Sequence, residues 1–460
     1  MSSKSISPRA ATAGTPSEAA YAAALHMLHA GQGDPMATID RALRHDPGFA
    51  EGHCLRAALL VMAARDDARP ALAHTLQALR SLPAARLSSR AARHLEAAQA
   101  WLDQELQHSL ALYGRIAADD PFDSLALRVA HYGDLEWGRR RELRDRVAAA
   151  LAHWDASMPF YGHLLAMHAF GLAENGDYDA AVDAGRRALR HVPDSAGAVH
   201  AIAHVMEMRG QAREGIDWLR STRRIWEASP GYGAHLWWHL ALRHIDAGEA
   251  QEALRIHDAR IVSIDNVSAL VDCSALLWRL ELSGHELGER WQRLADRWER
   301  VPLGGLRPFV DTHAMLAFAA AGRRASARRL TEAMRDYARQ SAELDDVVGS
   351  AALPVCEAMW AFGAGDYAQA ADRLETIRHL AQRCGGSLAQ CDLLALTLLE
   401  ASRRSGRIRR ARALAAERLV RRPGSRFDQQ LHARLAGPAE TADGMDAHWR
   451  GSDGELATAA

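Results

Sequence analysis

Four histidines form the pattern in this sequence that is best suited to chemistry. His200 and His204 are four residues apart, His235 and His239 are also four apart, and the two pairs are offset by 35 residues. Residues four apart lie on one face of a helix, and 35 residues is close to the length of one helix-turn-helix repeat. We therefore expect the two pairs to lie on equivalent helices of neighbouring repeats and to face the same space.

Further polar residues fall near the same face when each is counted back from the glycine at the following turn, at about 100° of rotation per residue. His313 and Glu174 fall within the arc of roughly 100° that holds the four histidines, and Glu207 falls just beside it. Trp238 lies next to the second pair and adds apolar area. The set of expected ligand-binding residues is His200, His204, Glu207, His235, Trp238, His239, His313 and Glu174.

Three kinds of chemistry suit such a cluster. Imidazoles can satisfy polar groups between packed helices, which would make them structural. Two pairs at this spacing, with Glu207, also supply enough donors for Zn, Mn or Fe, and the metal-ligand candidates are His200, His204, His235 and His239. Metal-free acid–base catalysis is the third use, and its candidates are His200, His204, Glu207, His235, His239 and His313.

The residues that follow the first histidine of each pair argue against one familiar metal site. Ala201 and Leu236 stand where metalloproteases carry the catalytic glutamate. A divalent metal is therefore an alternative that the pattern does not favour. No nucleophile elbow, phosphate-binding loop or dinucleotide fingerprint is present either.

The elements that must position these residues are helical repeats. Turn signals recur every 33 to 43 residues, and segments such as GDYDAAVDAGRRALRHVPDS from Gly176 follow the tetratricopeptide pattern. This period predicts an all-α, tetratricopeptide-like solenoid. We expect disordered tails at 1–17 and 437–460, N-terminal repeats or a cap at 18–120, and the array with the histidines at 121–436. In the glycine-rich GGSLAQCD segment, Ser387 is expected to be the N-cap of a helix.

Composition limits the partners and the compartment. The formal net charge of the 460 residues is −1, so we expect no nucleic-acid partner. The sequence has no run of 18 apolar residues and no secretory signal, which predicts no membrane span. Five cysteines without a Cys-x-x-Cys pair argue against a disulfide framework. These features favour a cytoplasmic protein.

Several segments resemble the tetratricopeptide repeat protein 38 family. They are HAIAHVMEMRG, HLWWHLAL with the following GEAQEALRIHDARI, MHAFGLAENGDY, DTHAMLAF and GGSLAQCD, in consistent order between residues of about 90 and 430. The resemblance implies an α-helical repeat protein and supplies no catalytic roles. This chain has Ala173, Leu236, Leu388 and Cys391 where the family usually has more polar residues, so any activity that needs the whole polar set is in question.

The leading hypothesis is a helical-repeat protein that binds a small ligand or a peptide in a concave pocket lined by histidine and tryptophan. An enzyme that uses the same histidines, with or without a metal, is the first alternative. A protein-interaction scaffold is the second. The substrate, the reaction and the oligomeric state do not follow from the sequence.

Overall fold

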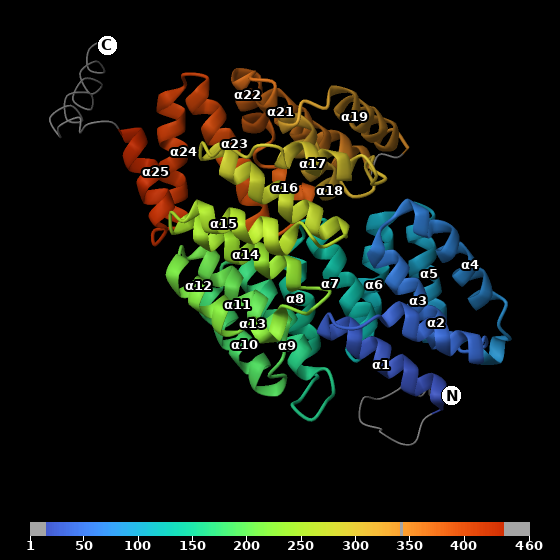
Figure 1. The fold of residues 1–460 in the computed structure, drawn as a ribbon. Coiled ribbons are helices and arrows are strands. Elements are labelled where there is room, and N and C mark those ends of the chain that lie inside the picture. The colour runs from blue at the N-terminus through green and yellow to red at the C-terminus, as the bar shows by residue number, and fades with distance from the viewer. Residues whose placement is uncertain (1–14, 341–343, 437–460) are drawn as a thin grey trace, which may run out of the picture.

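Every regular element in the part of the chain described by the computed structural model, residues 15–340 and 344–436, is a helix (Figure 1). The prediction of an all-α, tetratricopeptide-like solenoid is confirmed. The predicted disordered tails lie outside the described residues, except that the first helix already begins at Pro16. No helix in the described ranges is both long enough and apolar enough to cross a membrane.

The helices follow one another in short antiparallel pairs. The first seven are α1 Pro16–Ala30, α2 Pro35–His45, α3 Ala50–Ala63, α4 Arg69–Arg80, α5 Ser89–Leu102, α6 Leu106–Asp119 and α7 Ser124–Glu136. The middle of the chain forms α8 Arg140–Leu151, α9 Tyr161–Glu174, α10 Tyr178–His191, α11 Ala196–Met208, α12 Ala212–Ser221, α13 Arg223–Trp226, α14 Gly233–Asp246 and α15 Ala250–Ile256. The last helices are α16 Val267–Leu282, α17 Arg290–Trp298, α18 Pro308–Ala320, α19 Arg324–Ala338, α21 Leu353–Gly363, α22 Tyr367–Ile377, α23 Leu388–Arg404, α24 Ile408–Arg421 and α25 Arg426–Ala436.

The turns inside the repeats use residues that tolerate a left-handed backbone. A positive φ closes the first helix of a pair because it lets the chain reverse without a clash at Cβ. At two early turns that lack glycine, Ala64 and Gln104 take this conformation. The predicted turn glycines with positive φ are Gly33, Gly138, Gly176, Gly210, Gly248, Gly284, Gly322, Gly365 and Gly406.

The two helices of a repeat differ in how far they are buried. In α10 only small residues on one face are buried, such as Ala181 and Ala188, so this helix lies on the outside. In α11 and α14 almost every residue is buried. Alternate helices stack on one another, α9 on α11, α14 on α16, α16 on α18 and α18 on α21, and this stack forms the inner layer.

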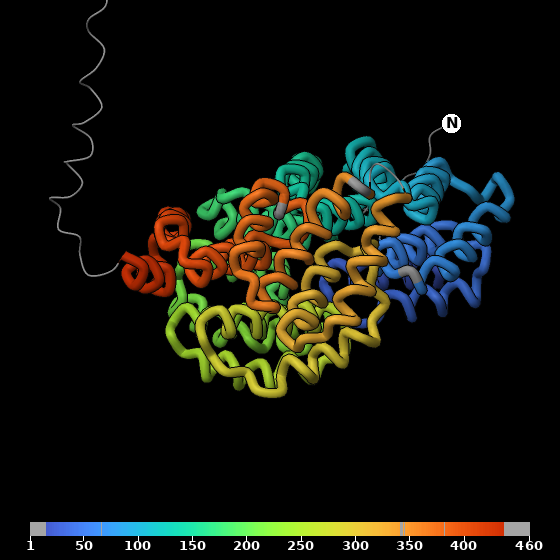
Figure 2. The backbone as a smooth tube through the Cα atoms, turned by 90° about the horizontal axis from the view of Figure 1, so that it is seen from above, coloured from blue at the N-terminus to red at the C-terminus, as the bar shows by residue number. Residues whose placement is uncertain are grey.

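The C-terminal helices return across the inner layer. Helix α23 packs against both α11 and α16, and α25 packs against α14. The N–H of Gly386 donates to the carbonyl of Leu135 at 3.1 Å, which joins the start of α23 to the end of α7. Figure 2 shows the orange and red helices lying over the green and teal ones. Inner helices are therefore buried on all sides because the end of the array covers the surface that an open solenoid would expose.

Two large apolar cores divide the described chain. One runs from Tyr21 through Met167 and also includes Leu344, and the other runs from Ala196 to Leu435. The first core continues past residue 120, so α7 and α9 bridge the predicted N-terminal segment and the array. Helix α11, which carries the first histidine pair, begins where the second core begins.

Candidate functional site

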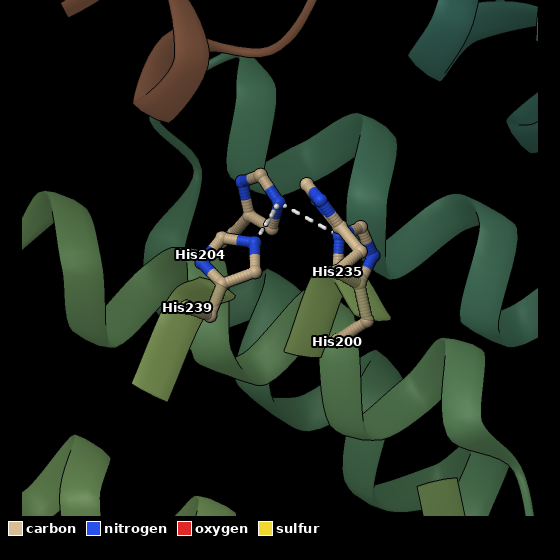
Figure 3. A group of neighbouring side chains, drawn as sticks. All are labelled: His200, His204, His235 and His239. Atoms are coloured by element: carbon tan, nitrogen blue, oxygen red, sulfur yellow. Dashed lines mark hydrogen bonds between the residues drawn. The ribbon is translucent and has the colours of Figure 1, made fainter. Parts of the chain in front are cut away.

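The four paired histidines meet at one point between α11 and α14 (Figure 3). The Nε2 atom of His204 lies 2.9 Å from Nε2 of His200 and 3.1 Å from Nε2 of His239. One ring nitrogen from each of these three residues and from His235 lies within 4.8 Å of the others. Four imidazole nitrogens this close form a donor set of the kind that binds a transition-metal ion.

The helical spacing explains why the rings converge. Each pair occupies successive turns of one helix, and α11 and α14 are equivalent inner helices of consecutive repeats, as the offset of 35 residues predicts. Ser195 caps α11 by accepting the N–H of Ala198, which fixes where this helix begins. The expectation that the two pairs share one space is met by these distances.

Glu174 stands behind His204, on the side away from the cluster. Its Oε1 lies 3.2 Å from Nδ1 of His204, at an angle outside that of a regular hydrogen bond. Its Oε2 accepts the backbone N–H of Leu388 at 2.7 Å, at the first turn of α23, and the Arg140 guanidinium lies 3.7 Å away. A carboxylate beside Nδ1 favours the tautomer of His204 that carries its proton there and leaves Nε2 as a lone pair.

Asp272 stands behind His235 in the same way. Its Oδ1 lies 3.0 Å from Nδ1 of His235, and its Oδ2 is buried without a hydrogen-bond partner among the described residues. Trp238 stacks on one face of the His235 ring, with the ring centroids 5.1 Å apart and the planes 14° from parallel. The orientation of His235 is thus fixed by a carboxylate from α16 and by an indole from its own helix.

The cluster is almost closed to solvent. His204 and His239 are 0% and 1% exposed, and His200 is 9% exposed, while the side chain of His235 retains 20% exposure. Burial, followed by the neighbouring imidazoles, holds the pKa of His200 and of His239 well below the usual 6.5. Both rings are therefore neutral at pH 7, which is the protonation state in which imidazole binds metals.

Two residues that the sequence placed with the histidines have other partners. Glu207 pairs with Arg243 and, at 3.5 Å, with Arg422. His313 donates from Nδ1 to the carbonyl of Phe309 at 2.8 Å and is not one of the four clustered histidines. The rotation angles counted back from the turn glycines do not predict the positions of these two side chains. The repeats differ in length, so residues at the same counted angle on successive helices do not face the same point.

Trp238 also departs from the expected role of lining an open concave surface. It is fully buried, between His235 on one face and the Arg279 guanidinium, whose Cζ lies 5.6 Å from the ring centroid. The sequence predicted an exposed inner surface around Trp238. That surface is covered instead, because α23 and α25 pack across it. The indole positions His235 rather than offering area to a ligand.

The sequence reasoning missed Asp272 and the start of α23. Asp272 stands twelve residues before Gly284, which places it about 60° outside the arc that holds the histidines, so the same count does not select it. No local signal could place Leu388 beside Glu174, which is 214 residues away. The expected N-cap role of Ser387 is confirmed, since its side chain accepts the N–H of Gln390 in a capping box.

The four departures from the family pattern lie in or near this region. Ala173 and Leu236 are fully buried and pack into apolar cores. Leu388 touches Glu174 through its backbone, and the Sγ of Cys391 lies 3.7 Å from a nitrogen of Arg140. None of the four replaces a histidine of the cluster or one of its two carboxylates.

No family model matches the sequence. The chain is similar to the human IFIT1 dimer with m7Gppp-AAAA, with 12% identity over 90% of this chain and 98% of that chain and a TM-score of 0.40. It is also similar to Naa15/Naa10 bound to HypK-THB, with 10% identity over 92% of this chain and 66% of that chain and a TM-score of 0.25.

One expectation about partners is corrected by these comparisons. The near-neutral charge predicted no nucleic-acid partner, whereas the human IFIT1 dimer to which the chain is similar is described with m7Gppp-AAAA. Net charge summed over a whole chain does not exclude a nucleic acid, because charge that is balanced overall can still be unevenly distributed.

Proposed function

We propose that this protein binds one first-row transition-metal ion through His200, His204, His235 and His239. The observation that carries the proposal is the convergence of three Nε2 atoms. That of His204 lies 2.9 Å from that of His200 and 3.1 Å from that of His239. Glu174 and Asp272 would orient two of the four rings, as carboxylates do behind metal-binding histidines in many proteins. Imidazole donors suit Zn, Cu, Fe or Ni better than Mg or Ca.

The distribution of protons supports a metal over a purely structural role. With the proton of His204 on Nδ1, beside Glu174, its Nε2 offers one lone pair to two neighbouring nitrogens. One imidazole lone pair lies along one in-plane direction and cannot accept two straight N–H bonds. A metal ion at the centre would instead accept the nitrogen lone pairs of all these rings as ligands.

The spacing of the donors supports a centre with room for a further ligand. Four nitrogens about 2.1 Å from a tetrahedral ion are separated by about 3.4 Å, whereas these four spread over as much as 4.8 Å. Two of the separations, 2.9 and 3.1 Å, are instead shorter than about 3.4 Å. This uneven spacing suits an irregular coordination sphere that also accepts water or substrate, and the rings must close in slightly for one ion to reach all four nitrogens. Catalysis at this ion is therefore the second candidate function, and the protein would then be a metal-dependent enzyme.

A small ligand that the histidines bind would, in this proposal, bind at the metal ion. A small ligand would reach the cluster on the side of His235, whose side chain is the most exposed of the four that converge. We propose further that the chain belongs to the tetratricopeptide repeat protein 38 family, on the motifs that contain both histidine pairs. All five cysteines are free thiols, which supports the proposed cytoplasmic location.

A metal titration tests the proposal. The full chain, produced without a polyhistidine tag, is stripped with a chelator and then titrated with Zn²⁺ by calorimetry. We expect about one ion per chain, as for a single four-ligand site. We expect the His204→Gln, His239→Gln double variant to bind less than a tenth of an equivalent at the same free Zn²⁺.

The matched control is His108→Gln, because His108 is an exposed histidine far from the cluster in sequence, and it should bind like the original chain. Near-UV circular dichroism establishes that the double variant is folded. Should the unaltered chain take up no Zn²⁺, Fe²⁺, Ni²⁺ or Cu²⁺ above the level of the double variant, the histidines are structural and the proposal fails.

A further inference from the structure

A cavity lies where the C-terminal helices return across the inner layer. It has a volume of about 410 Å³ and is bordered by α14 and α16 on one side and by α23, α24 and α25 on the other. This volume falls in the usual range for small-molecule sites. None of the four clustered histidines lines it, so it is separate from the proposed metal centre.

The charged groups of the cavity wall are not balanced. Six arginines and four carboxylates line the cavity, which leaves an excess of two positive charges. Most of these arginines are paired. Arg422 lies 2.7 Å from Asp246, Arg418 lies 2.5 Å from Asp392, and Glu400 pairs with both Arg403 and Arg404.

Arg279 is the exception in the buried part of this wall. It is 6% exposed, and among the described residues it forms no ion pair within 4.0 Å. Its two Nη atoms donate to the carbonyls of Ala389, at 2.6 Å, and Ala275, at 3.3 Å, although a guanidinium has five N–H donors. Burial lowers the pKa of Arg279, and Asp392 and Glu207, which lie beyond ion-pair distance, offset this effect only in part.

Most of the uncharged residues of the wall are apolar. Leu242, Ile245, Leu396, Leu399 and Phe427 line the cavity together with the partly exposed Leu431. A fully polar anion would leave this surface in contact with water, whereas an alkyl or aryl group would cover it. The lining therefore combines an apolar patch with a buried guanidinium that forms no ion pair within 4.0 Å among the described residues, beside charges that are paired with one another.

We propose that this cavity binds a small organic carboxylate with an apolar body. The carboxylate pairs with the free donors of Arg279, for which the planar guanidinium is well shaped, and the apolar body lies against the leucines and Phe427. This inference does not depend on the metal centre. The two sites are nevertheless adjacent, because Arg279 lies over Trp238, and Trp238 stacks on His235.

The test compares three probes by calorimetry on the full chain. Octanoate carries both features, 1-octanol is its neutral counterpart, and inorganic phosphate is an anion without an apolar body. We expect saturable binding of octanoate at one site and binding of the other two that is at least tenfold weaker, since a charged hydrogen-bond pair carries roughly a tenfold effect or more.

Two variants locate the binding. Arg279→Met keeps a side chain of similar volume, and we expect it to bind octanoate no better than 1-octanol. Leu431→Glu places a negative charge on the apolar wall and should abolish octanoate binding, while Leu431→Gln should weaken it far less. Arg293→Met is the control, because Arg293 is 75% exposed and pairs only with Glu289, and it should bind octanoate normally.

Each of three results would overturn the proposal. They are equal binding of octanoate and 1-octanol by the unaltered chain, phosphate binding as tight as that of octanoate, and unchanged octanoate binding by both Arg279→Met and Leu431→Glu. If Arg279→Met unfolds, as judged by circular dichroism, the contrast between Leu431→Glu and Leu431→Gln decides the matter.

Discussion

Glu174 accepts the backbone N–H of Leu388 at 2.7 Å, although the two residues are 214 positions apart in the chain. The other oxygen of the same carboxylate lies against His204. The first turn of α23, with its free N–H groups and positive end of the helix dipole, thus holds the group that orients a histidine of the proposed metal centre. The return of the C-terminal helices and the geometry of the site are parts of one arrangement.

The first prediction concerns this carboxylate. Glu174→Gln removes the negative charge and keeps the shape, so we expect Zn²⁺ affinity to fall by about 10- to 100-fold, the usual effect of losing a carboxylate behind a metal-binding histidine. Calorimetric titration of the metal-free chain measures this change. Glu214→Gln is the control because Glu214 is exposed on the outer helix α12. Equal affinities of both variants would show that Glu174 does not act on the metal.

The second prediction concerns the buried ion network below the cluster. Arg243 is 1% exposed and pairs with Glu207 and Asp246. Arg243→Met leaves these two carboxylates with Arg422 alone, so we expect the free energy of unfolding to fall by about 3 kcal/mol or more. Arg213→Met, which breaks the exposed pair with Glu249, should cost less than about 1 kcal/mol. Urea unfolding compares the two, and similar losses would contradict the prediction.

The third prediction concerns pH. Burial, with a contribution from Arg128, lowers the pKa of His131 to about 3, while the unfolded chain has a value of about 6.5. Below pH 6.5 the unfolded chain takes up a proton that the folded chain excludes, so stability falls as the pH is lowered from 6.5 towards 3. At pH 5 this residue alone lowers the free energy of unfolding by about 2 kcal/mol relative to pH 7.5.

Urea unfolding at pH 7.5, 6 and 5 checks this dependence in His131→Asn. The variant loses the contact with the Met167 carbonyl, so it should be less stable at pH 7.5 and yet lose less stability on acidification than the original chain. His108→Gln should keep the original pH profile. A parallel profile for His131→Asn would mean that another group causes the loss.

The fourth prediction concerns two turn glycines with similar backbones. Gly176 has a φ of +85° and no neighbour within 4 Å of an added Cβ, whereas Gly210 has a φ of +70° and the backbone nitrogen of Ser425 at 2.3 Å from that position. We expect Gly176→Ala to cost roughly 1 to 2 kcal/mol for the left-handed conformation. Gly210→Ala should cost clearly more, because it also pushes the α24–α25 turn away from α11. Equal losses in urea unfolding would argue against this close contact.

The sequence by itself determined what depends on neighbours along the chain. Turn glycines at a regular period and apolar residues at helical spacing predicted the solenoid, because a helix and its cap are set by residues within a few positions. The pairs His200 and His204, and His235 and His239, were aligned correctly because both the four-residue spacing and the 35-residue repeat are local regularities.

Only the tertiary structure decided which groups surround that cluster. The sequence placed Glu207 and His313 with the histidines, yet repeats of unequal length rotate successive helices by different amounts, and an angle counted along one helix does not carry over to the next. Asp272 reaches the site because α16 stacks on α14, and the first turn of α23 reaches it because the last helices pack back over the inner layer. That packing brings together segments more than two hundred residues apart, such as Glu174 and Leu388, and no periodic pattern in the sequence predicts contacts at that separation.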